Sequence, residues 1–397
     1  MSSTGARAAW RLLLVAGLLL LVAFVSASPA AAHTRTQETT NLDSRITRDP
    51  GLPGVHWRIY TGGLLVEVVN EGDGVLVVSG YEGEPYLRIG PDGVERNRRS
   101  PATYLNDERI GRRIGARTDV AMPRDVDAKA APEWIRISAE PMARWHDHRV
   151  HWMSPQPPGF VEAGPLSRTL MAANLVGVIG RAGDDAGVFR SWDIALTYDG
   201  TPAVLAGEMA WDDPPPAWPW LVAAALLVLP ALAGLRKRDP AAVVRPAAVV
   251  VLLVAGANAI HLVDDLVAWP GPLLDDLSGL LHTGLFLTVG VGASLWALRT
   301  DYGRVLAVAI ASGAVLYHQG LVHLPILQAS HFPSVWPDPL VRLTVAAGLL
   351  QALAVAAVIV RARRAGSPAP GGADRMPSDQ RPSGRAPSDQ ARRLAGT

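Results

Sequence analysis

The chain has 397 residues, a formal net charge of +1 and no cysteine. A nearly neutral chain lacks the basic excess of nucleic-acid-binding proteins, and without cysteine it contains neither disulfides nor thiolate metal ligands. The charge is unevenly distributed: residues 33–215 carry 20 Lys and Arg against 26 Asp and Glu, a net charge of −6, whereas residues 361–397 carry 8 Arg against 3 Asp, a net charge of +5. An acidic middle and a basic tail suit opposite faces of a membrane.

The first 32 residues have the pattern of an export signal. Two arginines precede the apolar run LLLVAGLLLLVAFV, and the small residues SASPAAA follow it. Cleavage after Ala32 satisfies the A-x-A rule and would leave His33 as the first mature residue, although cleavage after Ala27 or Ala30 is also allowed.

Residues 33–211 are expected to form an exported all-β domain, an Ig-like sandwich. The runs GLLVEVVN and GVLVVSGYEG are rich in β-branched residues, and the EGDG between them is a hairpin signal. The run WDIALTYDGTPAVLAGEMAW predicts two strands about a DG turn. A long stretch with helical periodicity is first met near residues 166–179.

The proline-rich residues 212–217 are predicted to form a short, stiff stalk. Five apolar segments follow, at residues 218–235, 246–263, 277–298, 305–327 and 340–360, each near the ~20 residues needed to cross a bilayer. Basic residues follow the first, third and fifth segments, in RKRD, RTDYGR and RARR. The positive-inside rule therefore predicts a multi-pass plasma-membrane protein with residues 33–217 outside the cell and its tail in the cytoplasm.

The tail, residues 361–397, is rich in Pro, Gly, Ser and Arg and contains PSDQ twice. It has no apolar periodicity with which to bury a core, so it is expected to be disordered. It is either solvated chain or a segment that binds anionic lipid or a partner.

Histidines from three of the apolar segments are expected at one depth in the membrane. A rise of ~1.5 Å per residue puts His261 and His318 about 20 Å above the cytoplasmic starts of their segments, and His282 roughly 8 Å below the outer surface. His323 lies nearer that surface, and Asp265 shares a helical face with His261. Such residues could bind a transition metal, hold a b-type haem between facing helices, conduct protons, or only hydrogen-bond between helices.

The stretch RWHDHRVHWM concentrates three histidines in six residues. On a strand, His146 and His148 would share one face and form a bidentate chelate, with His151 on the other face. In a helix, His148 and His151 would pair instead. A mature N-terminal His33 would add an amine and a ring nitrogen, a donor pair that favours Cu(II). The alternative is an edge strand stabilised by its tryptophans and an Asp–Arg pair.

Two resemblances add to this interpretation. His33, the run YDGTPAVLAG and the histidine-bearing membrane bundle resemble fused copper-resistance proteins of the CopC/CopD kind. That resemblance implies a CopC-like sandwich in which a mature N-terminal histidine helps to bind copper, although a CopD-like portion has more than five spans. SPATYLN and WHDHRVHWM resemble a family of actinobacterial membrane proteins with an exported ectodomain, which implies no particular activity.

The favoured function is binding, delivery or transport of a transition metal, copper by preference, by an exported domain attached to five transmembrane helices. G-x-S-x-G, Walker and H-E-x-x-H motifs are absent from the sequence, so a carrier, sensor or insertion factor is expected rather than an enzyme. The alternatives are a cell-envelope interaction protein with structural histidines, and a membrane redox protein that carries haem b. The expected metal ligands are His33, His146, His148, His151, His261, Asp265, His282, His318 and His323.

Overall fold

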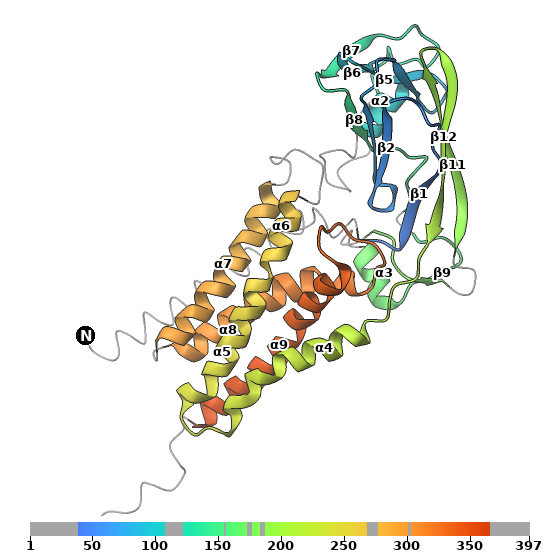
Figure 1. Cartoon of the computed structure of the whole chain (residues 1–397). Coiled ribbons are helices and arrows are strands. Elements are labelled where there is room, and N and C mark those ends of the chain that lie inside the picture. Colours follow the sequence, from blue (N-terminus) through green and yellow to red (C-terminus); the bar gives the residue numbers. More distant parts are fainter. Residues whose placement is uncertain are drawn as a thin grey trace, which may run out of the picture.

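The structure is a computed structural model, and it describes residues 39–107, 122–154, 156–172, 177–182, 187–267, 277–300 and 303–365. An N-terminal β-domain stands at one end of a bundle of long apolar helices (Figure 1). The expected signal sequence, His33 and most of the expected tail lie outside the described residues.

The β-domain contains two antiparallel sheets that share one core. The larger sheet has the strand order β1 (Leu42–Arg48), β12 (Thr201–Trp211), β11 (Val188–Tyr198), β4 (Leu76–Ser79), β5 (Pro85–Gly90), β6 (Gly93–Asn97) and β7 (Trp134–Ser138). The smaller sheet has the order β2 (Val55–Tyr60), β3 (Leu65–Asn70) and β8 (Met142–Trp145). Buried side chains of both sheets, among them Val68 and Ile194, pack into one cluster, as in a sandwich.

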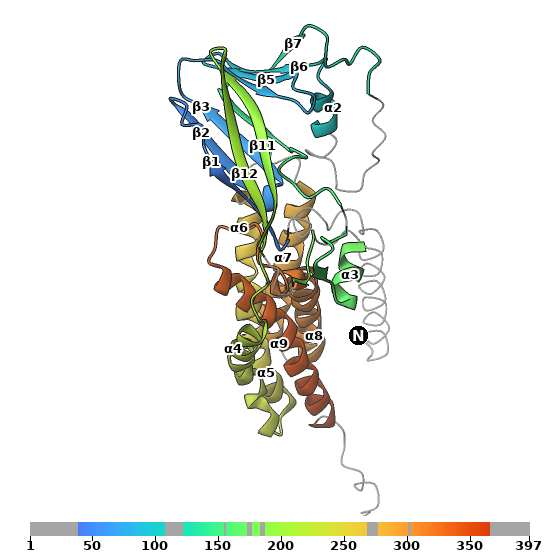
Figure 2. The ribbon, with the colours of Figure 1, turned by 90° about the vertical axis from the view of Figure 1, so that its right-hand side faces the viewer.

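Short elements lie within this domain or at its junction with the bundle (Figure 2). They are η2 (Thr61–Gly63), α2 (Pro101–Asp107), α3 (Pro165–Ala172) and the small pair β9 (Val161–Glu162) and β10 (Arg181–Ala182). Helix α3 begins where helical periodicity was expected.

One of the two predicted hairpins is confirmed and the other is wrong. Asp199 and Gly200, with φ angles of 48° and 80°, form the tight turn between β11 and β12, where a two-residue turn favours positive φ. By contrast, β3 pairs with β2 and β8, whereas β4 pairs with β5 and β11. The chain crosses between the sheets after Asn70, whose side-chain amide donates to the carbonyls of Gly74 (2.8 Å) and Ile89 (2.9 Å).

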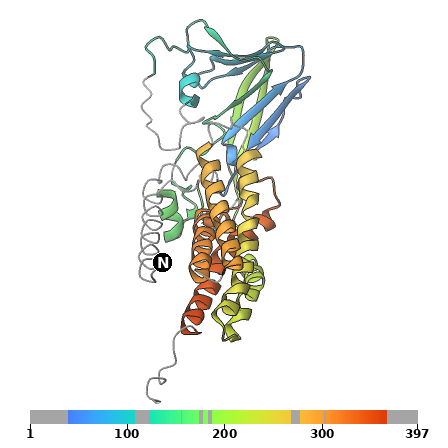
Figure 3. The same ribbon diagram turned by 90° about the vertical axis from the view of Figure 1, so that its left-hand side faces the viewer.

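The bundle is formed by helices separated by short distortions (Figure 3). They are α4 (Trp218–Val228), η3 (Leu229–Arg236), α5 (Pro240–Ala257), α6 (Ala259–Val267), α7 (Leu277–Arg299), α8 (Arg304–Val315), the π-helix η5 (Leu316–Val322), η6 (Leu324–Leu327) and α9 (Asp338–Ala365). Joined across the distortions, they give five segments long and apolar enough to cross a membrane, as predicted. Alanine and valine dominate the buried core, and small residues allow helices to approach closely.

The basic connections lie at the end of the bundle that points away from the β-domain. Helices α4, α7 and α9 all run in that direction (Figure 1). There the Arg361 guanidinium donates to the carbonyls of Leu235 (3.0 Å) and Lys237 (2.7 Å). Helix α9 continues to Ala365, so the first residues of the expected tail are helical.

The β-domain is hydrogen-bonded to the bundle through the loop after η6. Thr40 and His331 exchange two backbone hydrogen bonds of 2.9 Å each. The His331 ring also lies 2.8 Å from the Asp212 carboxylate, next to the predicted stalk. Ala329, from the same loop, packs beside Trp211 in a shared apolar cluster. The β-domain and the bundle are therefore joined by specific non-covalent contacts as well as by the polypeptide chain.

Candidate metal centre

The histidine-rich stretch is a turn rather than the strand that was considered from the sequence. Strand β8 ends at Trp145, and the backbone N–H groups of Val150 (3.1 Å) and His151 (3.2 Å) donate back to the Asp147 carbonyl. The Asp147 side chain also accepts a hydrogen bond from the Arg149 backbone N–H (3.0 Å). An aspartate in this position favours a local turn over continued strand pairing.

Because the chain turns, the three histidines meet on one side. The His146 ring centroid lies 5.3 Å from that of His148 and 5.0 Å from that of His151. The Nε2 atoms of His146 and His148 and the Nδ1 atom of His151 are shielded from solvent. His146 Nδ1 donates to the Leu64 carbonyl (2.8 Å), so the lone pair of a neutral His146 ring is on Nε2.

A buried ion pair holds this turn. Arg149 donates to both carboxylate oxygens of Asp147, with Nε–Oδ1 and Nη2–Oδ2 distances of 2.9 and 2.8 Å, and Trp145 Nε1 donates to Oδ2 (2.9 Å). Burial alone would raise the pKa of Asp147, but the hydrogen bonds and charge of Arg149 outweigh it, so the pKa lies below its usual value. Asp147 is thus a charge partner of Arg149, and it positions the histidines on either side.

Two residues missed by the sequence analysis complete the site, Tyr81 from the turn after β4 and Asn106 from α2. The Tyr81 hydroxyl accepts a hydrogen bond from the His148 backbone N–H (2.9 Å) and donates to Asn106 Oδ1. The Arg149 guanidinium lies 5.0 Å from the centre of the Tyr81 ring. Burial, with the Asp147 charge, raises the pKa of Tyr81 far above its usual value, so the hydroxyl keeps its proton. The only signal for these residues was the aromatic and polar content of the GYEGEP and SPATYLN loops.

The ring separations fit a shared metal ion. With metal–nitrogen bonds of about 2.0 Å, two imidazoles on one tetrahedral ion have ring centroids about 5 Å apart. The observed values are 5.0 and 5.3 Å. In the described part of the chain, no group of three or more His, Asp or Glu side chains is already arranged to hold a metal ion. The rings therefore have suitable separations, but they must rotate before their nitrogens converge.

The bundle brings together the histidines that were expected at one depth. The His318 ring centroid lies 5.2 Å from that of His282 and 4.9 Å from that of His323. His261 stacks on His323 with centroids 4.0 Å apart. Asp265 accepts a hydrogen bond from a threonine of α7.

Two polar residues of this cluster were not found from the sequence. Asn258, at the break between α5 and α6, has its Oδ1 atom 3.2 Å from His318 Nδ1. The Thr283 hydroxyl, on α7, lies 2.6 Å from Asp265 Oδ2 and 3.2 Å from His318 Nε2. Both residues are buried, and neither belongs to a recognisable motif.

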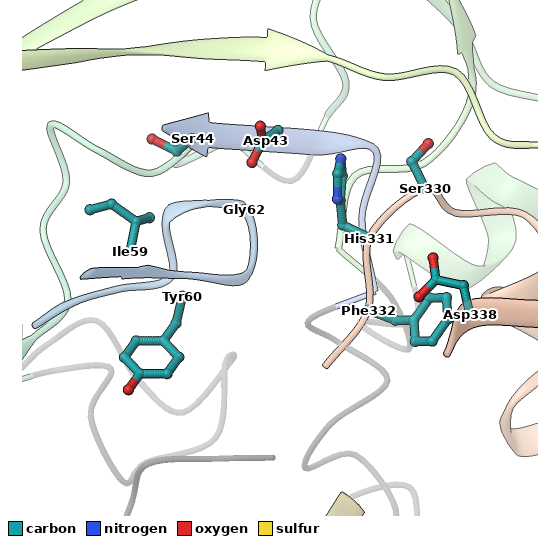
Figure 4. A pocket seen from close by; sticks show the side chains of 9 residues that line it. All are labelled: Asp43, Ser44, Ile59, Tyr60, Gly62, Ser330, His331, Phe332 and Asp338. Carbon is teal, nitrogen blue, oxygen red and sulfur yellow. The ribbon is translucent and has the colours of Figure 1, made fainter. Parts of the chain in front are cut away.

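A separate cavity of about 160 Å³ lies at the junction of the two parts. Figure 4 shows side chains of β1, β2 and the loop after η6 around it. Its lining shares no residue with either histidine cluster and consists of Asp43, Ser44, Ile59, Tyr60, Gly62, Ser330, His331, Phe332 and Asp338.

Searches against protein-family models, curated proteins and solved structures find no match to this chain.

Proposed function

We propose that this chain is a multi-pass plasma-membrane protein whose β-domain lies outside the cell and binds a transition metal ion, most favourably copper, for delivery or transport. The observation that carries the metal assignment is the turn holding His146, His148 and His151. The His146 ring is separated from each of the other two by a distance expected around one ion, and each of the three has a nitrogen shielded from solvent.

The orientation is supported by the distribution of basic residues. The RKRD, RTDYGR and RARR segments follow the helices that run away from the β-domain. Arginine and lysine near membrane helices favour the cytoplasmic side, so the β-domain would face the cell exterior. The export signal predicted in residues 1–32 agrees with this orientation.

The preference for copper follows from the donor atoms. Three imidazoles suit copper, zinc or nickel, and among these divalent ions copper binds nitrogen donors most tightly. The Asp147 carboxylate, which lies between His146 and His148 in the sequence, is bonded to Arg149, so the proposed donors are neutral nitrogens. His33 would add two nitrogen donors if processing made it the first residue, a prediction that mass spectrometry of the mature N-terminus can test.

The direct experiment is Cu²⁺ titration of the purified full-length protein in detergent, followed by electron paramagnetic resonance. His146→Ala/His148→Ala is expected to bind one Cu²⁺ fewer per chain than the parent, since two of the three donors are lost. His56→Ala is the matched control, because its side chain is 69% exposed on β2. Equal Cu²⁺ binding by the double variant and the parent, or none by the parent, would contradict the proposal.

A second candidate function, binding of a cell-envelope protein, is favoured by β7. This strand is at the edge of the larger sheet, and Ile135 and Ile137 on it are 48% and 49% exposed. Exposed edge strands can pair with a strand of another chain. In this case Ile135→Lys/Ile137→Lys would abolish in-cell cross-links to the partner while Cu²⁺ binding stayed unchanged.

A further inference from the structure

We propose that the helical bundle contains a second cation site, in which His282, His318 and His323 bind a transition metal ion beside Asp265. It goes beyond the proposed function because it lies in a different part of the molecule and uses none of the β-domain residues. It can therefore be correct or wrong independently of the β-domain site.

The hydrogen bonds of two of these rings determine which nitrogens can coordinate. His318 Nδ1 faces the Asn258 amide oxygen at 3.2 Å, and His323 Nδ1 faces the His318 carbonyl oxygen at 2.8 Å. Both oxygens can only accept, so both Nδ1 atoms carry the hydrogen, and each neutral ring has its lone pair on Nε2. Metal-binding histidines usually donate their other N–H to an oxygen in this way.

The hydrogen bonds of the Thr283 hydroxyl indicate that a positive charge is needed next to His318 Nε2. Its hydroxyl lies 2.6 Å from Asp265 Oδ2, and an ionised carboxylate only accepts, so the single hydroxyl hydrogen is donated there. The Thr283 oxygen consequently presents a lone pair to His318 Nε2, which lies 3.2 Å away and presents its own. Two lone pairs in this position repel each other unless a metal ion or a proton lies between or beside them.

The neighbouring rings favour a metal ion over a proton. His282 and His323 lie 5.2 and 4.9 Å from His318, close to the separation of about 5 Å expected for imidazoles on one ion. Their rings are inclined to that of His318 by 49° and 65°. As in the β-domain, the rings must rotate before their nitrogens converge, since no group of three or more such side chains in the described residues is already arranged to hold a metal ion. A proton bound to His318 Nε2 would need only one further hydrogen-bond partner. A metal ion, in contrast, would use both neighbouring rings as ligands.

His261, expected from the sequence to be a ligand, has a different position. Its ring stacks on that of His323 at 24° and 4.0 Å, so the in-plane nitrogens of the two rings point side by side rather than at one another. Its Nε2 atom lies 3.4 Å from Thr344 Oγ1, at the edge of hydrogen-bonding distance. We therefore assign His261 a packing role against the ligand His323.

The π-helix η5 explains why His318 and His323 meet. Residues five apart in an α-helix lie about 140° apart around the axis, at about 100° per residue. A π-helix closes its hydrogen bonds between residues i and i+5, which brings such residues to the same side. Single π-helical turns inside α-helices occur frequently at functional sites.

The charge of an ion at this position could be partly balanced by Asp265. Asp265 is half-buried, and α6 ends close to the β-domain (Figure 1). Its neighbour Asp264 has a structural role, since it accepts hydrogen bonds from the Ser334 hydroxyl (2.8 Å) and the Val335 backbone N–H (2.9 Å). A cation bound here would lie beside this carboxylate, and the two opposite charges would lower the cost of placing either one among apolar helices.

The experiment measures Cu²⁺ per chain in the full-length protein in detergent after excess Cu²⁺ has been removed on a desalting column. The starting protein is His146→Ala/His148→Ala, so that the β-domain site does not contribute. Adding His318→Gln is expected to lower the content by one ion per chain, and adding His282→Gln is expected to do the same. Adding His261→Phe, which keeps the stacked ring, is expected to leave the content unchanged.

Size-exclusion profiles identify any variant that fails to fold, and the two glutamine variants provide independent tests. An unchanged Cu²⁺ content in both would overturn the proposal and leave a proton as the cation between His318 and Thr283. A loss in the His261→Phe protein equal to that in the glutamine variants would also overturn it. If the β-domain site does not exist, the starting protein binds as much Cu²⁺ as the parent, and the loss caused by His318→Gln remains.

Discussion

The two histidine clusters are assembled in opposite ways. In the β-domain, three rings come from one short turn, which the buried Asp147–Arg149 ion pair holds together. In the bundle, four rings come from α6, α7 and the segment around η5, and their orientation depends on neutral hydrogen-bond partners, Asn258 and Thr283. A local cluster depends on the stability of its own turn, whereas a dispersed one depends on how the helices pack.

The largest effect on stability is expected from breaking the Asp147–Arg149 ion pair of the β-domain cluster. Asp147→Ala leaves the Arg149 charge buried without its carboxylate, which should lower the free energy of unfolding of the β-domain by about 3–5 kcal/mol. Tryptophan fluorescence during urea unfolding of the full-length protein measures this change. Asp193→Ala, at an exposed position on β11, is the control and should have little effect. Equal stability of the two variants would show that the turn does not need the pair.

Cu²⁺ binding should stabilise the β-domain through its histidine cluster, His146, His148 and His151. At a Cu²⁺ concentration 100 times the Kd, binding to the folded state adds about 2.7 kcal/mol to the free energy of unfolding. Thermal melts should therefore shift upward with Cu²⁺ in the parent protein, and by less in His151→Ala, in which the bundle site alone keeps all its ligands. The same upward shift in both proteins would exclude His151 as a ligand.

The Cu²⁺ affinity of the bundle cluster should depend on the neutral side chains that hydrogen-bond to its histidines. Asn258→Leu removes the acceptor that orients His318, so Cu²⁺ affinity at the bundle site should fall about 10- to 100-fold, equivalent to about 1.4–2.7 kcal/mol. Isothermal titration in the His146→Ala/His148→Ala protein isolates this site. Thr288→Val is the control, because this exposed hydroxyl donates to the Gly284 carbonyl of its own helix, at 2.8 Å. A similar loss in the control would attribute the effect to helix packing.

The smallest effect is expected at the junction between the clusters. The side chains of His331 and Asp212 are 32% and 46% exposed, and pairs of this kind contribute about 1 kcal/mol or less. His331→Ala should accelerate amide exchange in residues 39–48 and leave Cu²⁺ affinity at both clusters unchanged. A tenfold change in either affinity would show instead that the two clusters are coupled through this contact.

The features predicted correctly are those encoded by short stretches of sequence. The DG turn between β11 and β12 follows from two residues that tolerate positive φ, and the five apolar segments follow from hydropathy alone. The meeting of His282 and His318 could be expected because helical rise relates sequence position to depth.

The features that were missed depend on distant partners or local distortions. The end of β8 at Trp145 follows from the Asp147–Arg149 pair, which competes with continued strand pairing. The crossing from β3 to β4 follows from Asn70, whose amide bonds to another strand. The π-helix η5 has no distinctive composition, so the contact between His318 and His323 could not be anticipated.

The paired backbones of Thr40 and His331 also determine how the molecule can be dissected. An isolated bundle would lose the β-domain partner of its loop and leave Ala329 without Trp211 and Leu42, which pack in the same apolar cluster. Cutting the chain after β12 would consequently disrupt both fragments at the cut surface, rather than release two intact modules. The same pairing opposes rotation of the β-domain relative to the bundle, so an ion that leaves one cluster for the other would cross a gap whose width these contacts restrain.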